Sequence, residues 1–217
     1  MTPAMKRARN LAAFLPAAAA FACAHAAPST ARADVAAPVG QPPAEGRATE
    51  LTLGDFKARL STPAHPMPGA AAVLVLRGAS GPASARAGDE LAEAAVDAGI
   101  AALELESGSA GRALLWLGPR AKRIYVAAEG IAAATAAELV RSGHVAGLVL
   151  LDPPTNPAPT DIPCLVLEGG PAASKQNGRL WELTLPDLKS VASASPETTH
   201  TLVEATALWL TARAKEP

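Results

Sequence analysis

The chain has few of the side chains that cross-link a protein or bind metal ions. It contains 2 cysteines and 4 histidines among 217 residues, and the histidines show no paired spacing. Protein zinc sites need several such ligands close together, so we expect no metal centre. Cys23 lies in an N-terminal apolar run, and after loss of that run only Cys164 would remain. No intramolecular disulfide could then form, and stability must come from a hydrophobic core.

An excess of basic charge is also lacking. The chain has 19 Lys and Arg residues against 20 Asp and Glu residues, a formal net charge of −1 at pH 7. Arg120, Lys122 and Arg123 cluster just before an expected strand, and a solvated loop is the simplest interpretation of this cluster. A near-neutral chain without a larger basic stretch is not typical of nucleic-acid-binding proteins, so we expect no nucleic-acid partner.

Residues 1–26 have the pattern of a secretory signal peptide. A basic segment at 6–9 precedes an apolar run at 11–24, which is too short to span a bilayer. The small residues before Ala27 fit a cleavage site, and cleavage there would remove 3 of the 19 basic side chains, leaving 16 against 20 acidic ones. The residues before Cys23 make a poor lipidation motif, so we expect no lipid anchor. The sequence predicts a periplasmic or secreted protein.

The remaining chain divides into a linker and one domain. Residues 27–48 are rich in proline, alanine and small polar residues without an apolar period, which predicts a disordered linker. Residues 49–217 are long enough for a single domain with a sizeable core. No second long apolar run or internal repeat occurs, so we expect no membrane span. Nothing in the sequence indicates an oligomeric state.

Short β-favouring runs alternate with helical patterns along residues 49–217. This alternation predicts an α/β fold with a mostly parallel sheet and helices on both faces. The expected strands are short apolar runs at 51–53, 56–60, 72–76, 100–105, 124–126, 145–151, 162–167 and, as an edge strand, 180–185. The expected helices begin at Asp89, near Leu114, at Ala132 and after Ser195.

Residues 122–139 predict a strand, a sharp turn and a helix. At the turn the sequence reads Ala127-Ala128-Glu129-Gly130-Ile131, where α/β-hydrolases carry the nucleophile motif G-x-S-x-G. Two further phrases match that family in order and separation, Arg77-Gly78 after one expected strand and Asp152-Pro153 after another. The chain therefore resembles an α/β-hydrolase from about residue 51 to residue 214. The short connection that follows Asp152 leaves no room for a cap domain.

The resemblance places Glu129 at the position of the nucleophile. An Asp plays that part in some members of the fold, but Glu is one methylene longer, and Ile131 replaces a small residue that packs closely in the family. Glu129 is therefore either a nucleophile or a structural residue hydrogen-bonded to nearby N–H groups. In an alternative register Gly130 occupies the turn, where glycine tolerates a positive φ, and the chain has no nucleophile. The sequence does not separate these registers.

The resemblance also implies a base and two oxyanion donors. His200 is the candidate base, because it follows the last expected strand and precedes the final helix. Alternatively, Ser195-Pro196-Glu197 starts that helix and places His200 on its surface. The backbone N–H groups of Ala79 and Gly130 would hold the oxyanion.

The resemblance implies that Ala172 occupies the position where the family has the acid that orients the histidine, so that acid is missing from its usual place. Asp152 or Asp161 would have to replace it. With Glu129 and His200, either acid would complete a hydrolase of small esters or related acyl compounds. The altered triad positions instead favour a pseudo-hydrolase that keeps the fold as a binding or interaction module.

No cofactor is expected from the sequence. Residues 78–81 superficially resemble a dinucleotide-binding turn, but Pro82 and Ser84 stand where further glycines are needed to approach a pyrophosphate. The resemblance to α/β-hydrolases implies a small-molecule ligand or substrate as the partner.

Overall fold

The computed structural model describes residues 47–53, 56–67, 70–78, 82–155, 161–171, 173–185 and 194–216. These residues belong to one compact unit, Gly46–Pro217. The predicted signal peptide and nearly all of the predicted linker lie outside the described residues. Strand β1 begins at Arg47, so the ordered domain starts slightly earlier than the sequence indicates.

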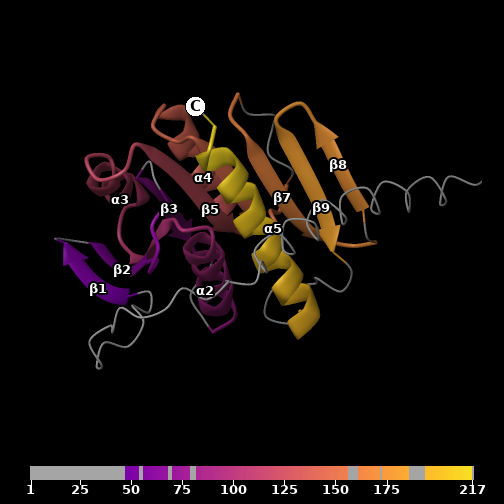
Figure 1. Ribbon diagram of the computed structural model, residues 1–217, viewed down its shortest axis with the longest axis horizontal. Coiled ribbons are helices and arrows are strands. Elements are labelled where there is room, and N and C mark those ends of the chain that lie inside the picture. The colour runs from indigo at the N-terminus through magenta and orange to yellow at the C-terminus, as the bar shows by residue number, and fades with distance from the viewer. Residues whose placement is uncertain are drawn as a thin grey trace, which may run out of the picture. The chain divides into compact units, whose positions relative to one another are not determined.

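The described residues form a nine-stranded sheet with the order β1-β2-β4-β3-β5-β6-β7-β9-β8 (Figure 1). From β4 to β9 in this order all neighbours are parallel, whereas β1, β2 and β8 pair antiparallel at the two sides. This arrangement confirms the predicted mostly parallel sheet. The strands are β1 (Arg47–Leu53), β2 (Phe56–Thr62), β3 (Ala71–Leu76), β4 (Ala101–Ser107), β5 (Arg123–Glu129), β6 (Gly147–Leu151), β7 (Cys164–Gly169), β8 (Ala173–Asn177) and β9 (Leu180–Leu185).

Helices cover both faces of this sheet (Figure 1). α2 (Pro82–Asp97) and α5 (Pro196–Ala214) pack into one core of buried residues, and α3 (Ala110–Leu117) and α4 (Ala132–Arg141) pack into the other. The central strands are apolar along nearly their whole length because both of their faces are covered. None of the described helices is long and apolar enough to cross a membrane.

Strands β3 and β5 are neighbours at the centre of the sheet. Leu76 of β3 lies opposite Ala128 of β5, and Leu74 lies opposite Val126. The chain runs from β3 to β4 on one side and then crosses to β5 on the other side, so the strand order reverses here. Ligands of open α/β sheets bind at the carboxyl ends of the strands beside such a reversal. The ends of β3 and β5 are therefore the place to look for a site.

Two elements differ from the predicted ones. Helix α2 begins at Pro82 rather than at Asp89, because proline fits the first helical position, where no N–H partner is needed. Strand β9 is not at the edge, since β8 pairs with its outer side. The polar sequence of β8 has no apolar alternation, and its hairpin is formed by a tight turn in which Gly178 has φ 59°.

Candidate functional site

The turn that follows β5 is built around Gly130. Strand β5 ends at Glu129, and α4 begins at Ala132. Gly130 has φ 52°, a left-handed conformation that L side chains rarely adopt, whereas Glu129 still belongs to the strand. A Cβ atom on Gly130 would meet no heavy atom within 4 Å, so the space beside it is open. Gly130 therefore holds the strained position of the turn and presents no reactive atom there.

Small residues lie two positions before and two positions after Gly130. Ala128 is fully buried and Ala132 nearly so, whereas Ile131 is 69% exposed. Ile131 thus points to solvent and does not crowd the packing of α4 against β5, contrary to expectation. The turn has the geometry of the alternative register. In it, Ala128 and Ala132 take the places of the two motif glycines, and Gly130 takes the place of the nucleophile.

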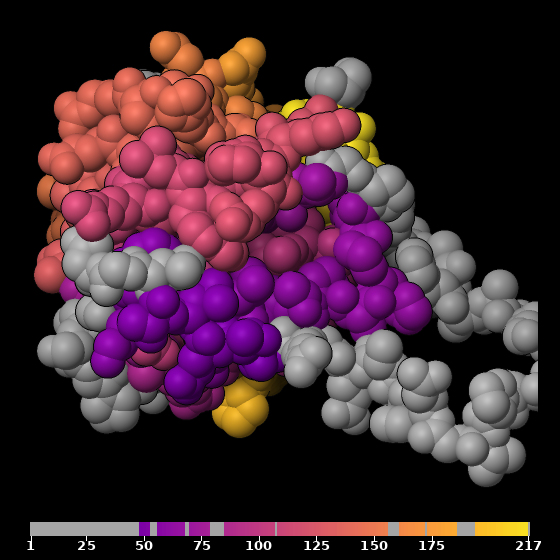
Figure 2. Space-filling model, turned by 90° about the vertical axis from the view of Figure 1, so that its left-hand side faces the viewer, coloured from indigo at the N-terminus to yellow at the C-terminus, as the bar shows by residue number. Residues whose placement is uncertain are grey.

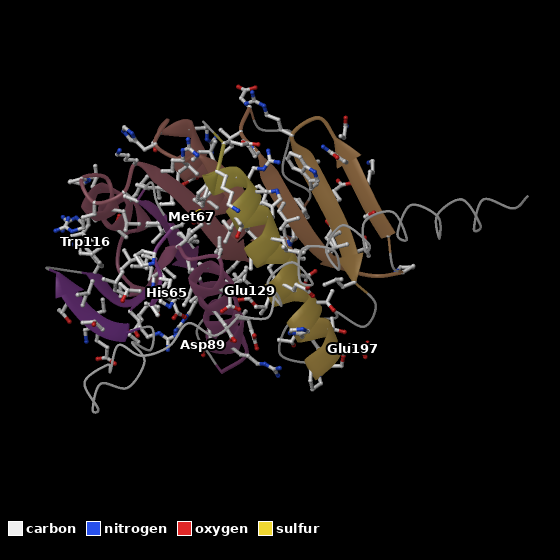
Figure 3. All side chains as sticks on the ribbon, in the orientation of Figure 1. His65, Met67, Asp89, Trp116, Glu129 and Glu197 are labelled. Carbon is white, nitrogen blue, oxygen red and sulfur yellow. The ribbon has the colours of Figure 1, made fainter. Side chains whose placement is uncertain are left out.

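Glu129 joins the ends of β5 and β3. Its carboxylate oxygen Oε2 accepts a hydrogen bond from the backbone N–H of Gly78, at 3.3 Å. A Cβ atom on Gly78 would lie 2.6 Å from the carbonyl oxygen of Glu129, so only glycine permits this approach of the two strand ends. Glu129 is half-buried, makes a further interaction, and lies in the central part of the domain (Figure 3). These contacts are typical of a structural carboxylate.

The predicted oxyanion donors are only partly described. Ala79 lies outside the described residues. The N–H of Gly130 donates to the carbonyl of Leu151 at 2.8 Å, so it extends the pairing of β5 with β6 and is not available to an oxyanion. Ile131 and Ala132 come next and open α4, and N–H groups in a first helical turn have no acceptor within the helix. Any oxyanion donor at this turn would therefore come from these two residues.

The structure places His200 on the surface of α5. Ser195 caps this helix by accepting a hydrogen bond from the N–H of Thr198 at 3.1 Å, and Pro196 is the first helical residue. His200 is exposed and lies one turn inside the helix, which is the second of the two placements that the sequence leaves open.

Asp152 lies beside Gly130 at the carboxyl ends of neighbouring strands. Leu151, the last residue of β6, accepts the hydrogen bond from Gly130, and Asp152 follows it directly. Asp152 is exposed and has φ 46°, a left-handed conformation that Asp tolerates better than most residues. The structure thus brings Glu129, Gly130 and Asp152 together at one edge of the sheet.

The other acid candidates stand apart from this group. Asp161 is exposed just before β7, and its carbonyl accepts a hydrogen bond from Arg179. Ala172 lies outside the described residues. No group of three or more His, Cys, Asp or Glu among the described residues could hold a metal ion.

An ion cluster around a buried glutamate, next to the turn, was not predicted from the sequence. Glu104 of β4 is 1% exposed and accepts hydrogen bonds from Nε of Arg77 at 2.7 Å and from Nε of Arg59 at 3.0 Å. Gly88 of α2 leaves room for it, since a Cβ there would strike the carboxylate. Burial lowers the pKa of Arg59, but hydrogen bonds to Asp89 and Glu104 outweigh burial and raise it above its ordinary value.

This cluster fixes the strand end that holds Glu129. Arg77 directly precedes Gly78, and its guanidinium is tied to Glu104 beneath α2. The sequence signal for the cluster was Glu104 in the middle of a strand whose preceding residues are all apolar. Such a residue is almost never buried without a charged partner.

Comparisons with known proteins agree on the fold. No protein-family model and no curated protein sequence matches the chain. Among solved structures, the carboxylesterase EstE1, cloned from a metagenomic library, matches with TM-score 0.59 and 15% identity over 100% of this chain and 99% of that chain. An arylesterase matches with TM-score 0.58 and 10% identity over 80% and 85% of the two chains.

A serine hydrolase homologue from Coxiella burnetii matches with TM-score 0.56 and 12% identity over 76% of this chain and 97% of that chain. Identities this low establish the fold and nothing finer. The mostly parallel sheet with helices on both faces is the part of this chain that the matches support. This chain has the α/β-hydrolase fold.

Proposed function

We propose that this protein is an exported, non-catalytic member of the α/β-hydrolase fold that binds a small molecule at the carboxyl ends of β3, β5 and β6. The observation that carries the proposal is the left-handed conformation of Gly130, φ 52°. A glycine at the strained position provides no hydroxyl, thiol or carboxylate to attack an acyl carbon. The open space beside Gly130 is then room for a ligand rather than for a nucleophile.

The contacts of Glu129 support the same proposal. Its carboxylate accepts a hydrogen bond from the N–H of Gly78. Glu129 is also the last residue of β5 and not part of the turn. Attack on a substrate would require it to leave this contact. Hydrolysis on this fold also needs a base within reach of the reacting atoms, and His200 is exposed on α5.

An ester hydrolase is the second candidate, and the structural neighbours favour it because they are esterases by name. In this reaction the carboxylate of Glu129 would attack the acyl carbon and release the alcohol. His200, oriented by Asp152 or Asp161, would then activate the water that cleaves the acyl anhydride. The position of Asp152 beside the open turn is the structural observation in its favour.

Hydrolysis of activated esters separates the two candidates. The full chain, Glu129→Gln and His200→Ala are assayed with nitrophenyl esters of short acids, and Glu138→Gln, an exposed glutamate on α4, is the matched control. The proposal expects all four proteins to show no saturable turnover. Saturable turnover in the wild type and the control that is lost in Glu129→Gln would establish the ester hydrolase instead.

Ligand binding is tested on the same proteins by thermal unfolding in the presence of short-chain acids, esters and amides. A ligand that binds only the native state raises Tm, and the stabilisation grows with the logarithm of the ligand concentration above Kd. The proposal expects a rise with at least one compound class that is reduced in Asp152→Ala and kept in Glu138→Gln. A Tm that stays constant with every compound would remove the small-molecule part of the proposal.

Export is tested separately, on the chain recovered from the cell that makes it. Cleavage of the signal segment predicts a mature protein whose N-terminal residue is Ala27 in the periplasmic or culture fraction. An intact N-terminus in the cytoplasmic fraction would contradict export.

A further inference from the structure

One stretch of the chain is basic and free of acidic residues. Residues 107–128 contain no Asp or Glu, although the whole chain has more acidic than basic side chains. Arg120 and Lys122 lie in this stretch and are exposed. Arg141, the last residue of α4, and His144 in the turn after it are also exposed.

The fold gathers these side chains at the amino ends of the parallel strands. The N–H of Lys122, just before β5, donates to the carbonyl of Ala70, just before β3, at 2.8 Å. The N–H of Ala146, just before β6, donates to the carbonyl of Ile124 at 2.7 Å. Arg120 and Lys122 therefore lie on the same edge as Arg141 and His144, which come before Ala146. Glu106, Glu129 and Asp152 lie at the opposite, carboxyl-end edge of the sheet. Asp161, just before β7, and Glu216, which pairs with Arg213 next to Arg123, lie at the amino-end edge but outside this group.

Two apolar side chains lie in the last turn of α3, which precedes Arg120 in the chain. Leu115 is 71% exposed, the largest exposure among the big apolar side chains of the described residues. Trp116 is half-buried, and the guanidinium of Arg120 stacks over its ring at 4.1 Å from the centroid while donating to the Trp116 carbonyl at 2.7 Å. Figure 3 places Trp116 at the margin of the domain, away from Glu129, and the pink segment around α3 is exposed beside the indigo β1 and β2 in Figure 2.

We propose that Leu115, Trp116, Arg120, Lys122, Arg141 and His144, here called the basic patch, dock the protein on an anionic lipid surface. The basic side chains complement negatively charged headgroups, and the projecting leucine and the amphipathic tryptophan fit the boundary between headgroups and acyl chains. Contact at the amino-end edge leaves the open turn at Gly130 facing the aqueous phase.

A nucleic acid fits the basic patch less well than a lipid surface does. Bases stack on the free face of an aromatic ring, and in this patch the guanidinium of Arg120 lies over the ring of Trp116. A phosphate backbone does not remove the exposed side chain of Leu115 from water. A lipid surface does, and the removal of apolar surface from water favours binding. A few charges with one or two apolar side chains give weak, reversible membrane binding.

Co-sedimentation of the full chain with lipid vesicles tests the proposal. Vesicles of phosphatidylcholine alone are compared with vesicles that also contain phosphatidylglycerol, at a lipid concentration that sediments half of the wild type. The variants are Leu115→Asp and the pair Arg120→Gln with Lys122→Gln. The control variants are Leu208→Asp on α5 and Lys57→Gln on β2, which are exposed outside the patch. The N-terminal apolar run is common to all of these proteins, so the comparison isolates the patch.

We expect binding to depend on phosphatidylglycerol and to be lost in about 1 M salt, where charges are screened within a few ångströms. Each neutralised basic residue should weaken partitioning about fivefold, so the double substitution should weaken it about 25-fold. Leu115→Asp should weaken it as well, and both control variants should bind like the wild type.

Equal binding to the two kinds of vesicle, or an equal loss in Lys57→Gln and in the double variant, would overturn the proposal. Circular dichroism of each variant separates loss of the patch from loss of the fold. Binding of the full chain to a single-stranded oligonucleotide, with no preference for anionic vesicles, would assign the patch to nucleic acid instead.

Discussion

The backbone N–H of Gly78 donates a hydrogen bond to the carboxylate of Glu129, at 3.3 Å, and so joins the carboxyl ends of the two central strands. The sequence suggests Glu129 as a nucleophile, but in this contact its carboxylate accepts a structural hydrogen bond. The strained position of the turn passes to the next residue, Gly130, which has no side chain. The proposal that the protein is non-catalytic depends on this division of roles between Glu129 and Gly130.

The close approach of these strand ends predicts that Gly78→Ala destabilises the protein. The added Cβ would lie 2.6 Å from the Glu129 carbonyl, and overpacking of this kind costs about 2 kcal/mol of unfolding free energy. Gly111→Ala in α3 is the matched control, because its Cβ would meet nothing closer than 3.7 Å and alanine favours a helix by about 1 kcal/mol. Urea unfolding of both variants checks the prediction. Equal stabilities would show that the strand ends do not touch.

The buried carboxylate of Glu104 predicts a large loss of stability in Glu104→Ala. Removal of Glu104 leaves the partly buried guanidinium groups of Arg59 and Arg77 without the carboxylate that they share, and we expect a loss of about 2 kcal/mol. Glu106→Ala, two residues along the same strand and exposed, should change stability by less than about 0.5 kcal/mol. Chemical denaturation at neutral pH distinguishes the two. A loss in Glu104→Ala no larger than in Glu106→Ala would contradict the cluster.

Cys164 predicts a pH dependence of stability on the alkaline side. Burial, followed by repulsion from Glu182, raises the pKa of its thiol from 9.0 to about 12. As the pH rises, the unfolded chain therefore loses this proton before the native protein does. The free energy of unfolding is unaffected by this group below about pH 9 and falls as the pH rises further. At about pH 10 the loss should be about 1.4 kcal/mol, and Cys164→Ala should remove it. Identical pH profiles of unfolding for the two proteins would contradict the prediction.

The sequence predicts the fold well where both faces of a strand are buried. Strands β3, β5 and β6 are continuous apolar runs, and such runs are recognisable without any tertiary information. Strand β8 is polar at every position after its first residue, because it forms an edge and is held by hairpin hydrogen bonds rather than by burial. Local composition therefore could not reveal it.

The site was less predictable because its roles depend on backbone conformation. The adjacent residues Glu129 and Gly130 both fit the turn by residue type, and only the φ angle of Gly130 assigns the strained position. His200 likewise had two placements, and the capping hydrogen bond from Thr198 to Ser195 puts it inside α5. The sequence offered the correct alternative in both cases, but the backbone conformation and the capping hydrogen bond were needed to choose it.

The reactivity of single cysteines at positions 129 and 130 tests the assignment of the turn most directly. Gly130→Cys would place a thiol in open space at the start of α4, where a helix N-terminus lowers a thiol pKa and favours the reactive thiolate. Glu129→Cys would place it against Gly78, in the half-buried position of the carboxylate. Both variants are made with Cys23→Ser, and the buried Cys164 contributes a slow background.

The second-order rate of thiol alkylation is measured for both variants under native conditions. The account predicts that Gly130→Cys reacts at least about tenfold faster than Glu129→Cys, because its thiol is exposed and more fully ionised. A faster reaction at position 129 would contradict it, since that residue would then stand where the fold presents its nucleophile.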